Sequence, residues 1–261
     1  MVSRSDRALD GHVWAPLSMI GADFPLVSIV TVTYNCEGLI ESTLESVCSQ
    51  TYPNKEHIIV DGGSTDKIIE IIEKYSDRIA RFVSEKDNGI YDAMNKGIRL
   101  ASPESLYITF LNAGDIYADT GVIQNMIAGA KSTHANLYGN ISVNQQVVEA
   151  PRELNQFSLA TNMVCHQACF FLTESHRKFL YDTQYKICAD YKLLLELVRA
   201  REPFEKIDIT VAEMDVSGVS HSERVLLLAE KRQIRKLYPE VYFYAVIKNS
   251  FDRLRRMIGP A

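Results

Sequence analysis

Short polar segments follow apolar runs at several places in the first half of the chain, and their side chains could do chemistry. The run "LYITFL" (106 to 111) ends in "NAGD" (112 to 115), which offers the Asn112 amide and the Asp115 carboxylate three residues apart. Oxygen ligands of this kind suit Mg²⁺ or Mn²⁺. A buried strand that simply stops at an acid would look the same, so the surrounding elements must decide between a metal site and a strand end.

A second segment, "DGGSTD" (61 to 66), follows the apolar run "EHIIV". The Asp61 carboxylate could accept a hydrogen bond from an imide N–H such as that of uracil, and the two glycines after it would let a flat base approach the backbone. The alternative is a helix-capping loop, in which Ser64 or Thr65 is the cap and Asp66 meets the positive helix end. Capping leaves Asp61 unexplained because Asp61 precedes the cap.

A third segment, "EKDNGIYDAMNKGI" (85 to 98), repeats polar residues at helical spacing. Asp92 and Asn95 are three residues apart, so they share a helix face and could reach a ribose or a base together. Lys96 could meet a phosphate. The alternative for these three residues is a solvated helix face.

The sequence offers little support for a dinucleotide-binding motif, a Walker A loop or a zinc site. The chain has neither the GxGxxG fingerprint of dinucleotide-binding folds nor a Walker A loop. Its five cysteines are odd in number and scattered, which favours reduced thiols and the cytosol over a disulfide framework. Cys165, His166 and Cys169 are close together, but no second Cys/His pair stands at zinc-ligand spacing.

The elements that must position these segments alternate between β-branched apolar runs and helical patterns. Strands are predicted at 27 to 33, 56 to 60, 79 to 85 and 106 to 111, and helices at 38 to 50, 66 to 75 and 89 to 101. This order predicts the α/β class, with a doubly wound, mostly parallel sheet. Ligands bind outside the carboxyl ends of such strands, where all of the polar segments lie.

The second half of the chain is less regular and predicts an extension of this sheet that shapes a second pocket. The expected elements are helices at 120 to 131 and 190 to 200, and strands at 135 to 150, 165 to 172 and 204 to 212. Asp190 precedes the apolar-periodic run "YKLLLELV", where it could be a helix N-cap or a general base.

In order and spacing, "VSIVTVTYN", "DGGSTD", "EKDNGIYDAMNKGI" and "FLNAGD" resemble glycosyltransferase family 2, the inverting enzymes with a GT-A fold. The resemblance covers roughly residues 25 to 220 and is closest to the branch that builds bacterial exopolysaccharide or O-antigen units, such as the colanic-acid-type transferases. It implies a nucleotide-sugar site in which Thr33, Tyr34 and Asp61 serve the base and Asp92 and Asn95 the nucleoside. "NAGD" then takes the place of the family's acidic metal motif.

The resemblance also implies the catalytic and acceptor residues. Asp190 matches the family's general base, and His166 and Gln167 in "HQACFF" match a stretch that lines the acceptor pocket. His221 is a candidate ligand of the diphosphate or the metal. The chain departs from the family where several acids are usual, since Asp115 is the only acid of "NAGD". Mg²⁺ is often held by one or two carboxylates plus substrate phosphates, so metal affinity should depend on the bound donor.

Composition and apolar run lengths restrict the class of protein to which the chain can belong. A hydrophobic content of 46% with 23% charged residues is typical of a globular chain and excludes a disordered or fibrous one. No apolar run has the length of a membrane span, and the first 24 residues lack a secretory core. We expect a tail at 1–24, a GT-A domain at 25–221 and basic amphipathic helices at 222–261.

The predicted C-terminal helices could bind a membrane surface. Residues 222–261 carry a net charge of +5 in a chain of net −5. The predicted apolar face holds Tyr244, Ile247, Phe251, Leu254 and Ile258, and such a basic amphipathic helix can lie in a lipid interface. Packing on the catalytic domain or on a second copy in a homo-oligomer is the alternative.

These observations predict a glycosyltransferase that depends on Mn²⁺ or Mg²⁺. It would move a sugar from a nucleotide donor, most simply UDP-linked, to a glycan acceptor on a lipid carrier in surface polysaccharide synthesis. We expect it in the cytoplasm or on the inner face of the cell membrane, with no nucleic-acid partner. The alternative is a catalytically weak sugar-nucleotide or glycan binding protein in an assembly complex, which the single acid of "NAGD" would permit.

Overall fold

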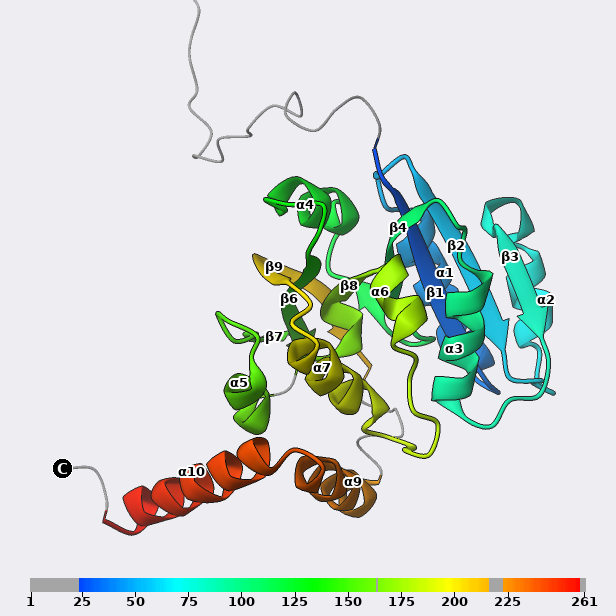
Figure 1. Cartoon of the computed structure of the whole chain (residues 1–261). Coiled ribbons are helices and arrows are strands. Elements are labelled where there is room, and N and C mark those ends of the chain that lie inside the picture. The colour runs from blue at the N-terminus through cyan, green and yellow to red at the C-terminus, as the bar shows by residue number, and fades with distance from the viewer. Residues whose placement is uncertain (1–23, 163, 216–222, 259–261) are drawn as a thin grey trace, which may run out of the picture.

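The computed structural model describes residues 24–162, 164–215 and 223–258, and the first half of the chain forms the predicted strand and helix alternation (Figure 1). The strands are β1 (Leu26–Thr33), β2 (Lys55–Asp61), β3 (Arg81–Ser84) and β4 (Ser105–Phe110). The connecting helices are α1 (Glu37–Cys48), α2 (Ile68–Glu73), the short 3-10 helix η2 (Ser76–Arg78) and α3 (Ile90–Leu100).

The second half extends the sheet and adds helices. Its strands are β5 (Ile116–Tyr117), β6 (Asn136–Val143), β7 (Gln146–Val148), β8 (Cys169–Leu172) and β9 (Phe204–Met214). Its helices are α4 (Val122–Gly129), α5 (Gln156–Thr161), the 3-10 turn η3 (His166–Ala168), α6 (Thr173–Lys178), α7 (Ala189–Arg199), α9 (Arg224–Lys236) and α10 (Pro239–Ile258).

One nine-stranded sheet runs through the molecule in the order β3-β2-β1-β4-β8-β6-β9-β5, with β7 paired to β6. The strands β1 to β4 are parallel, whereas β8 runs antiparallel to both of its neighbours. The predicted doubly wound, mostly parallel sheet with an extension is therefore confirmed. The strand order reverses at β1, because β2 and β3 lie on one side of it and β4 on the other, and ligands of such sheets bind at the carboxyl ends of the strands at this point.

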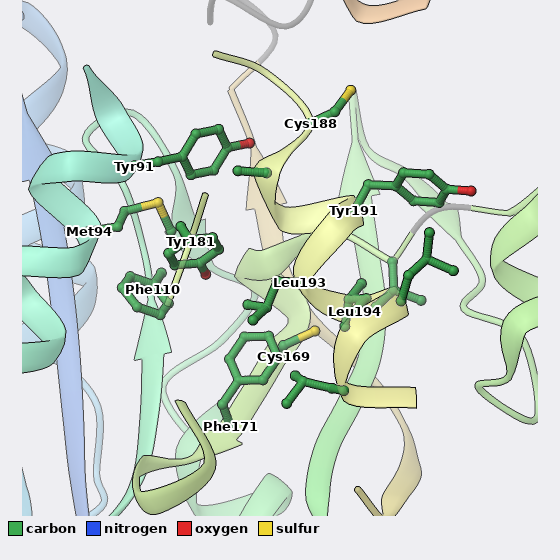
Figure 2. Close-up of a cluster of buried hydrophobic side chains, with 14 of the residues drawn as sticks. Tyr91, Met94, Phe110, Cys169, Phe171, Tyr181, Cys188, Tyr191, Leu193 and Leu194 are labelled. Atoms are coloured by element: carbon green, nitrogen blue, oxygen red, sulfur yellow. The ribbon is translucent and has the colours of Figure 1, made fainter. Parts of the chain in front are cut away.

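Side chains alternate between the two faces of the sheet, and each face has its own core. Ile29 and Ile59 pack with α1, α2 and α4 on one side, while Val30 and Ile58 pack with α3 and α7 on the other. Figure 2 shows part of the second core, in which Tyr91 and Met94 of α3 face Tyr181 and the α7 leucines Leu193 and Leu194. This packing fixes α3 and α7 relative to the strand ends.

The helices α9 and α10 lie along one side of the molecule, where α10 packs against α5 and α9 (Figure 1). Val241 and Ala245 are buried on the inner face of α10. No helix within the described residues is long and apolar enough to cross a membrane.

Three local predictions need correction. The single strand expected at 135 to 150 is a hairpin, because Asn144 and Gln145 adopt positive φ values of 50° and 62° and reverse the chain. The strand expected at 165 starts at Cys169, after η3. The helix expected at 66 begins at Ile68, and neither Ser64 nor Thr65 caps it.

Candidate active site

Four loops meet at the carboxyl ends of β1, β2, β3 and β4, as the sequence predicted. The β2–α2 loop is tied to β1 by the Gly62 N–H, which donates to the Thr33 carbonyl at 2.9 Å. The Ala113 N–H donates to the Val32 carbonyl at 3.2 Å, which ties the "NAGD" segment to the same strand. The polar segments therefore share one edge of the sheet.

Asp61 is an anchor of its own loop. It is fully buried, and one carboxylate oxygen accepts from the N–H groups of Gly63 (3.1 Å) and Ser64 (2.9 Å) and from the Ser84 hydroxyl (2.6 Å). The other oxygen accepts from the Ser64 hydroxyl at 2.5 Å. Burial and these four bonds make Asp61 a structural anchor of the loop, so a contact between Asp61 and the base stays a prediction.

An exposed aromatic ring and a second carboxylate lie beside this loop. Tyr34 is 62% exposed at the end of β1. A Cβ on Gly62 would lie 3.2 Å from the Tyr34 ring and 2.5 Å from an oxygen of Asp87. Asp87 was among the polar segments in the sequence but had no assigned role. Thr33 is 6% exposed and its hydroxyl lies 2.9 Å from the Cys36 sulfur, so it lines the loop from inside.

Asp92 and Asn95 of α3, which were predicted to bind the nucleoside together, contact different parts of the protein. Asn95 is 4% exposed, and its amide donates to the Tyr181 carbonyl (2.8 Å) and accepts from the Tyr181 N–H (2.9 Å). Asn95 therefore holds the segment before α7 in place, and its contact with the nucleoside stays a prediction. Asp92 stays at the loop, where its carboxylate accepts from the Asn88 N–H at 3.0 Å.

Lys96 also holds structure together. Its ammonium donates to the Lys86 carbonyl at 3.0 Å and pairs with Glu85 at 2.9 Å. Both contacts fasten the loop that carries Asp87 to α3. The prediction that Lys96 meets a phosphate is not supported, because its charge is already paired.

Asp115 forms a buried corner after β4. Its two oxygens accept from the Gln167 amide (2.9 Å) and from the Asp215 N–H (2.9 Å). Burial raises the pKa of Asp115, and the neighbouring Asp215 adds to this effect. The side-chain oxygens of Asn112 and Gln167 are buried without a hydrogen-bond partner in the described structure. An oxygen-rich corner with unpaired oxygens fits a bound cation.

Asp190 lies in the first turn of α7 and is 5% exposed. One oxygen accepts from its neighbour's N–H (Tyr191, 2.7 Å) and from the Tyr91 hydroxyl (3.3 Å), and the other lies 3.4 Å from Nδ1 of His166. Nε2 of His166 lies 2.9 Å from the Asn112 amide. His166 therefore bridges the "NAGD" segment and Asp190, and the N-cap of α7 is Cys188 rather than Asp190.

The acceptor prediction for Gln167 is not supported, since its amide nitrogen holds Asp115 and its side chain is 6% exposed. His166 and Gln167 are adjacent residues of η3, so this one turn connects the two carboxylates. The thiols of Cys165 and Cys169 stay protonated, because burial raises the pKa of Cys165 to about 12 and that of Cys169 further. A zinc site there is disfavoured, as metal binding requires thiolates.

Three functional candidates escaped the sequence interpretation. Asp215 directly follows β9, and its carboxylate lies 3.0 Å from where a Gly114 Cβ would be. Tyr91 donates its hydroxyl proton to the Ile187 carbonyl at 2.6 Å, and the same hydroxyl lies 3.3 Å from an Asp190 oxygen. Glu230 of α9 accepts from the N–H groups of residues 186, 187 and 188 at 2.8 to 3.0 Å, just before α7. Only Asp215, an acid at a strand end, carried a signal in the sequence.

His221, predicted as a metal ligand, lies outside the described residues. Among the residues that the structure describes, no group of three or more His, Cys, Asp and Glu side chains could hold a metal ion.

Comparisons with known proteins agree with this geometry. The family model described as Glycosyl transferase family 2 matches residues 28–187. An uncharacterized glycosyltransferase of Mycobacterium tuberculosis is 30% identical over 224 residues, which cover 82% of this chain and 84% of the relative.

Solved structures share the fold. One crystal structure of S. aureus TarS matches with a TM-score of 0.65 at 18% identity, over 83% of this chain and 43% of that chain, and a structure of TarS 1-349 in complex with UDP-GlcNAc matches with a TM-score of 0.65 at 17% identity. The mannosyltransferase PcManGT from Pyrobaculum calidifontis, in complex with GDP-Man and Mn²⁺, matches with a TM-score of 0.61 at 18% identity, over 85% of this chain and 64% of that chain. The family model covers more than half of the chain, and the relative is similar along most of its length. The chain therefore belongs to glycosyltransferase family 2 and has the GT-A fold.

Proposed function

We propose that the protein transfers a sugar, with inversion, from a nucleoside diphosphate donor of the UDP class to a hydroxyl of a glycan acceptor. The observation that carries the proposal is the pairing on η3, where His166 contacts Asp190 and Gln167 contacts Asp115. One short turn thus joins a carboxylate suited to proton abstraction to a carboxylate suited to a cation and a diphosphate.

Asp190 is the proposed general base. The acceptor oxygen attacks the anomeric carbon of the donor, its proton passes to Asp190, and the bond from the anomeric carbon to the diphosphate oxygen breaks. His166 and Tyr91 hold the Asp190 carboxylate in one orientation. Burial raises the pKa of Tyr91, so its hydroxyl keeps its proton and remains a donor.

The proposed cation is Mn²⁺ or Mg²⁺. Asp115 and Asp215 supply carboxylates, Asn112 supplies an amide oxygen without another partner in the described structure, and the donor diphosphate would complete the ligands. A divalent cation supplies positive charge for the leaving diphosphate. The Mn²⁺ in the PcManGT complex supports this choice. His221 stays a candidate ligand from the predicted pattern.

A lipid-linked acceptor and a peripheral position on the inner face of the membrane complete the proposal. Phe243 and Phe251 of α10 are 64% and 67% exposed, with Val246 and Ile247 exposed between them. The basic charge of residues 222–261 adds attraction to anionic lipid. Lys231 and Arg235 do not contribute to this surface, because both lie against the Tyr191 ring.

Sedimentation with vesicles tests this surface. The protein should pellet with phosphatidylglycerol vesicles and less with phosphatidylcholine ones, and Phe251→Asp should weaken binding. Val147→Asp is the control, since Val147 is similarly exposed on β7. Unchanged pelleting of Phe251→Asp would contradict the proposal, and a concentration-dependent dimer without vesicles that this variant abolishes would assign the face to a homo-oligomer.

Release of nucleoside diphosphate tests the activity itself. The protein is incubated with UDP-, GDP- and dTDP-sugars, Mn²⁺ or Mg²⁺, and lipid-linked acceptors. Asp190→Asn should lower turnover by about 100-fold or more while donor binding persists, and Glu240→Gln on exposed α10 should match the wild type. Donor binding without release under every condition would favour the alternative, a sugar-nucleotide binding protein in an assembly complex.

A further inference from the structure

Tyr34, Gly62 and Asp87 lie together after β1, β2 and β3, and the space that they border, which we call the slot, has the chemistry of a nucleobase-binding site. Both carboxylate oxygens of Asp61, the acid expected to contact the base, already accept hydrogen bonds from Gly63, Ser64 and Ser84. The Asp87 carboxylate lies against the bare Cα of Gly62, on the side where the exposed Tyr34 ring also lies. This inference rests on the proposed function, because the ligand is the nucleoside part of the donor.

Asp87 has one oxygen engaged and one available. The first oxygen accepts from the Gly89 N–H at 2.9 Å. The second is the oxygen that faces Gly62, and no described residue donates to it. Asp87 also has no ion-pair partner among the described side chains, although Lys86 and Lys96 are near in sequence, since Lys96 pairs with Glu85.

The loop that carries Asp87 is held in place from three directions. The Glu85 N–H donates to the Asp61 carbonyl at 3.0 Å and continues the pairing of β2 with β3. Lys96 binds the Lys86 carbonyl, and Gly89 binds Asp87 itself. A carboxylate fixed in this way needs little reorganisation to accept a hydrogen bond from a ligand.

The shape of the slot depends on Gly62. Its φ is not in the left-handed region, so the backbone does not require glycine there. A side chain would instead meet the Asp87 carboxylate at 2.5 Å and the Tyr34 ring at 3.2 Å. Glycine at this position therefore leaves room for the acid beside the ring.

We propose that Asp87 reads the donor base by accepting its ring N–H, with the base stacked on Tyr34. A single available carboxylate oxygen matches the one imide N–H of uracil or thymine. Cytosine presents an unprotonated ring nitrogen at that position, which a carboxylate repels. Guanine presents two adjacent donors, of which only one could be met by the available oxygen.

A chemical double-mutant cycle tests the proposal by calorimetry with UDP, N3-methyl-UDP and CDP in the presence of Mn²⁺. Asp87→Ala should weaken UDP binding by about 10-fold to 100-fold, the range for a hydrogen bond to a charged group. N3-methyl-UDP lacks the ring N–H, so the same substitution should change its affinity less than about 3-fold. Asp87→Asn should shift the preference from UDP toward CDP, because its amide N–H can donate to the cytosine nitrogen.

Two further variants complete the test. Gly62→Ala should weaken UDP binding as Asp87→Ala does, because its methyl displaces the carboxylate, and Glu70→Gln on the exposed face of α2 should bind like the wild type. Equal losses of UDP and N3-methyl-UDP in Asp87→Ala would overturn the proposed contact while leaving the proposed function intact. Absence of nucleoside diphosphate binding to the wild type would overturn both.

Discussion

Replacement of Asp61 tests whether this acid builds the site rather than binding the donor. The carboxylate is fully buried and accepts four hydrogen bonds, two of them from backbone N–H groups. Asp61→Ala removes both acceptor oxygens and leaves the donors of four part-buried hydrogen bonds without this partner. Hydrogen bonds to charged groups contribute about 1.5 to 3 kcal/mol each and are not additive, so we expect a loss of about 4 kcal/mol in the free energy of unfolding. A loss of this size lowers the Tm by roughly 10 °C in a chain of this length.

Asp61→Asn provides the graded comparison. The amide oxygen of the introduced asparagine can replace the carboxylate oxygen that accepts from Gly63, Ser64 and Ser84. The amide nitrogen then takes the place of the other carboxylate oxygen and can donate to the Ser64 hydroxyl. Only the charge assistance is lost, so the expected cost is about 1 to 2 kcal/mol. The variant should fold and bind UDP within about 3-fold of the wild type, because hydrogen bonds of this kind need not be charged to hold the loop.

The assays are urea unfolding followed by circular dichroism and calorimetric titration with UDP and Mn²⁺. Asp77→Ala is the matched control, since Asp77 lies on η2 with only an exposed ion pair to Arg78. Its unfolding free energy should change by less than about 0.5 kcal/mol. The reasoning fails if Asp61→Asn keeps wild-type stability and loses UDP affinity 10-fold or more, since that result would make Asp61 the residue that meets the base.

Three other perturbations have defined outcomes. Glu230→Ala should lower the unfolding free energy by about 3 kcal/mol, because three backbone N–H groups before α7 lose their acceptor. It should also lower kcat while changing the KM for the donor less. Glu223→Gln, which alters an exposed acid next to α9, is the control, and equal kinetics for the two variants would contradict a positioning role for Glu230. Asp115→Asn should abolish metal-dependent turnover. The variant should be at least as stable as the wild type at pH 7, because burial raises the pKa of Asp115 and makes its ionised form costly to fold. This stability advantage of the variant should disappear at lower pH, where the wild-type carboxylate is protonated, and a clear loss of stability at pH 7 would refute the reasoning. Acidification should destabilise the fold from pH 6.5 toward pH 4, because burial lowers the pKa of His176 to about 4 and that of His57 to about 3, and the unfolded chain binds these protons first. His176→Gln should reduce the fall of the urea midpoint across that range and leave the part due to His57, and an unchanged fall would contradict the assignment.

The sequence by itself determined the parallel half of the sheet and the edge at which the site lies. Nearly continuous apolar, β-branched runs such as "VSIVTVT" are buried on both faces, and a sheet covered by helices on both sides satisfies that pattern. The polar ends of these runs must then meet, because parallel strands all finish at one edge. Asp115 and Tyr34 were located in this way from local information, whereas Asp190 was singled out by its place before a helical run.

Tertiary structure alone decided what each acid does. Asp61 and Asp87 both follow strands, and their separate roles depend on contacts with Ser84 and Gly62 that no local pattern encodes. The link from Asp115 to Asp190 passes through η3, and Glu230 reaches α7 from a helix more than 40 residues away in sequence. A side chain that bonds a distant backbone has the same local pattern as one that faces solvent, so only the folded chain separates an anchor from a binding residue.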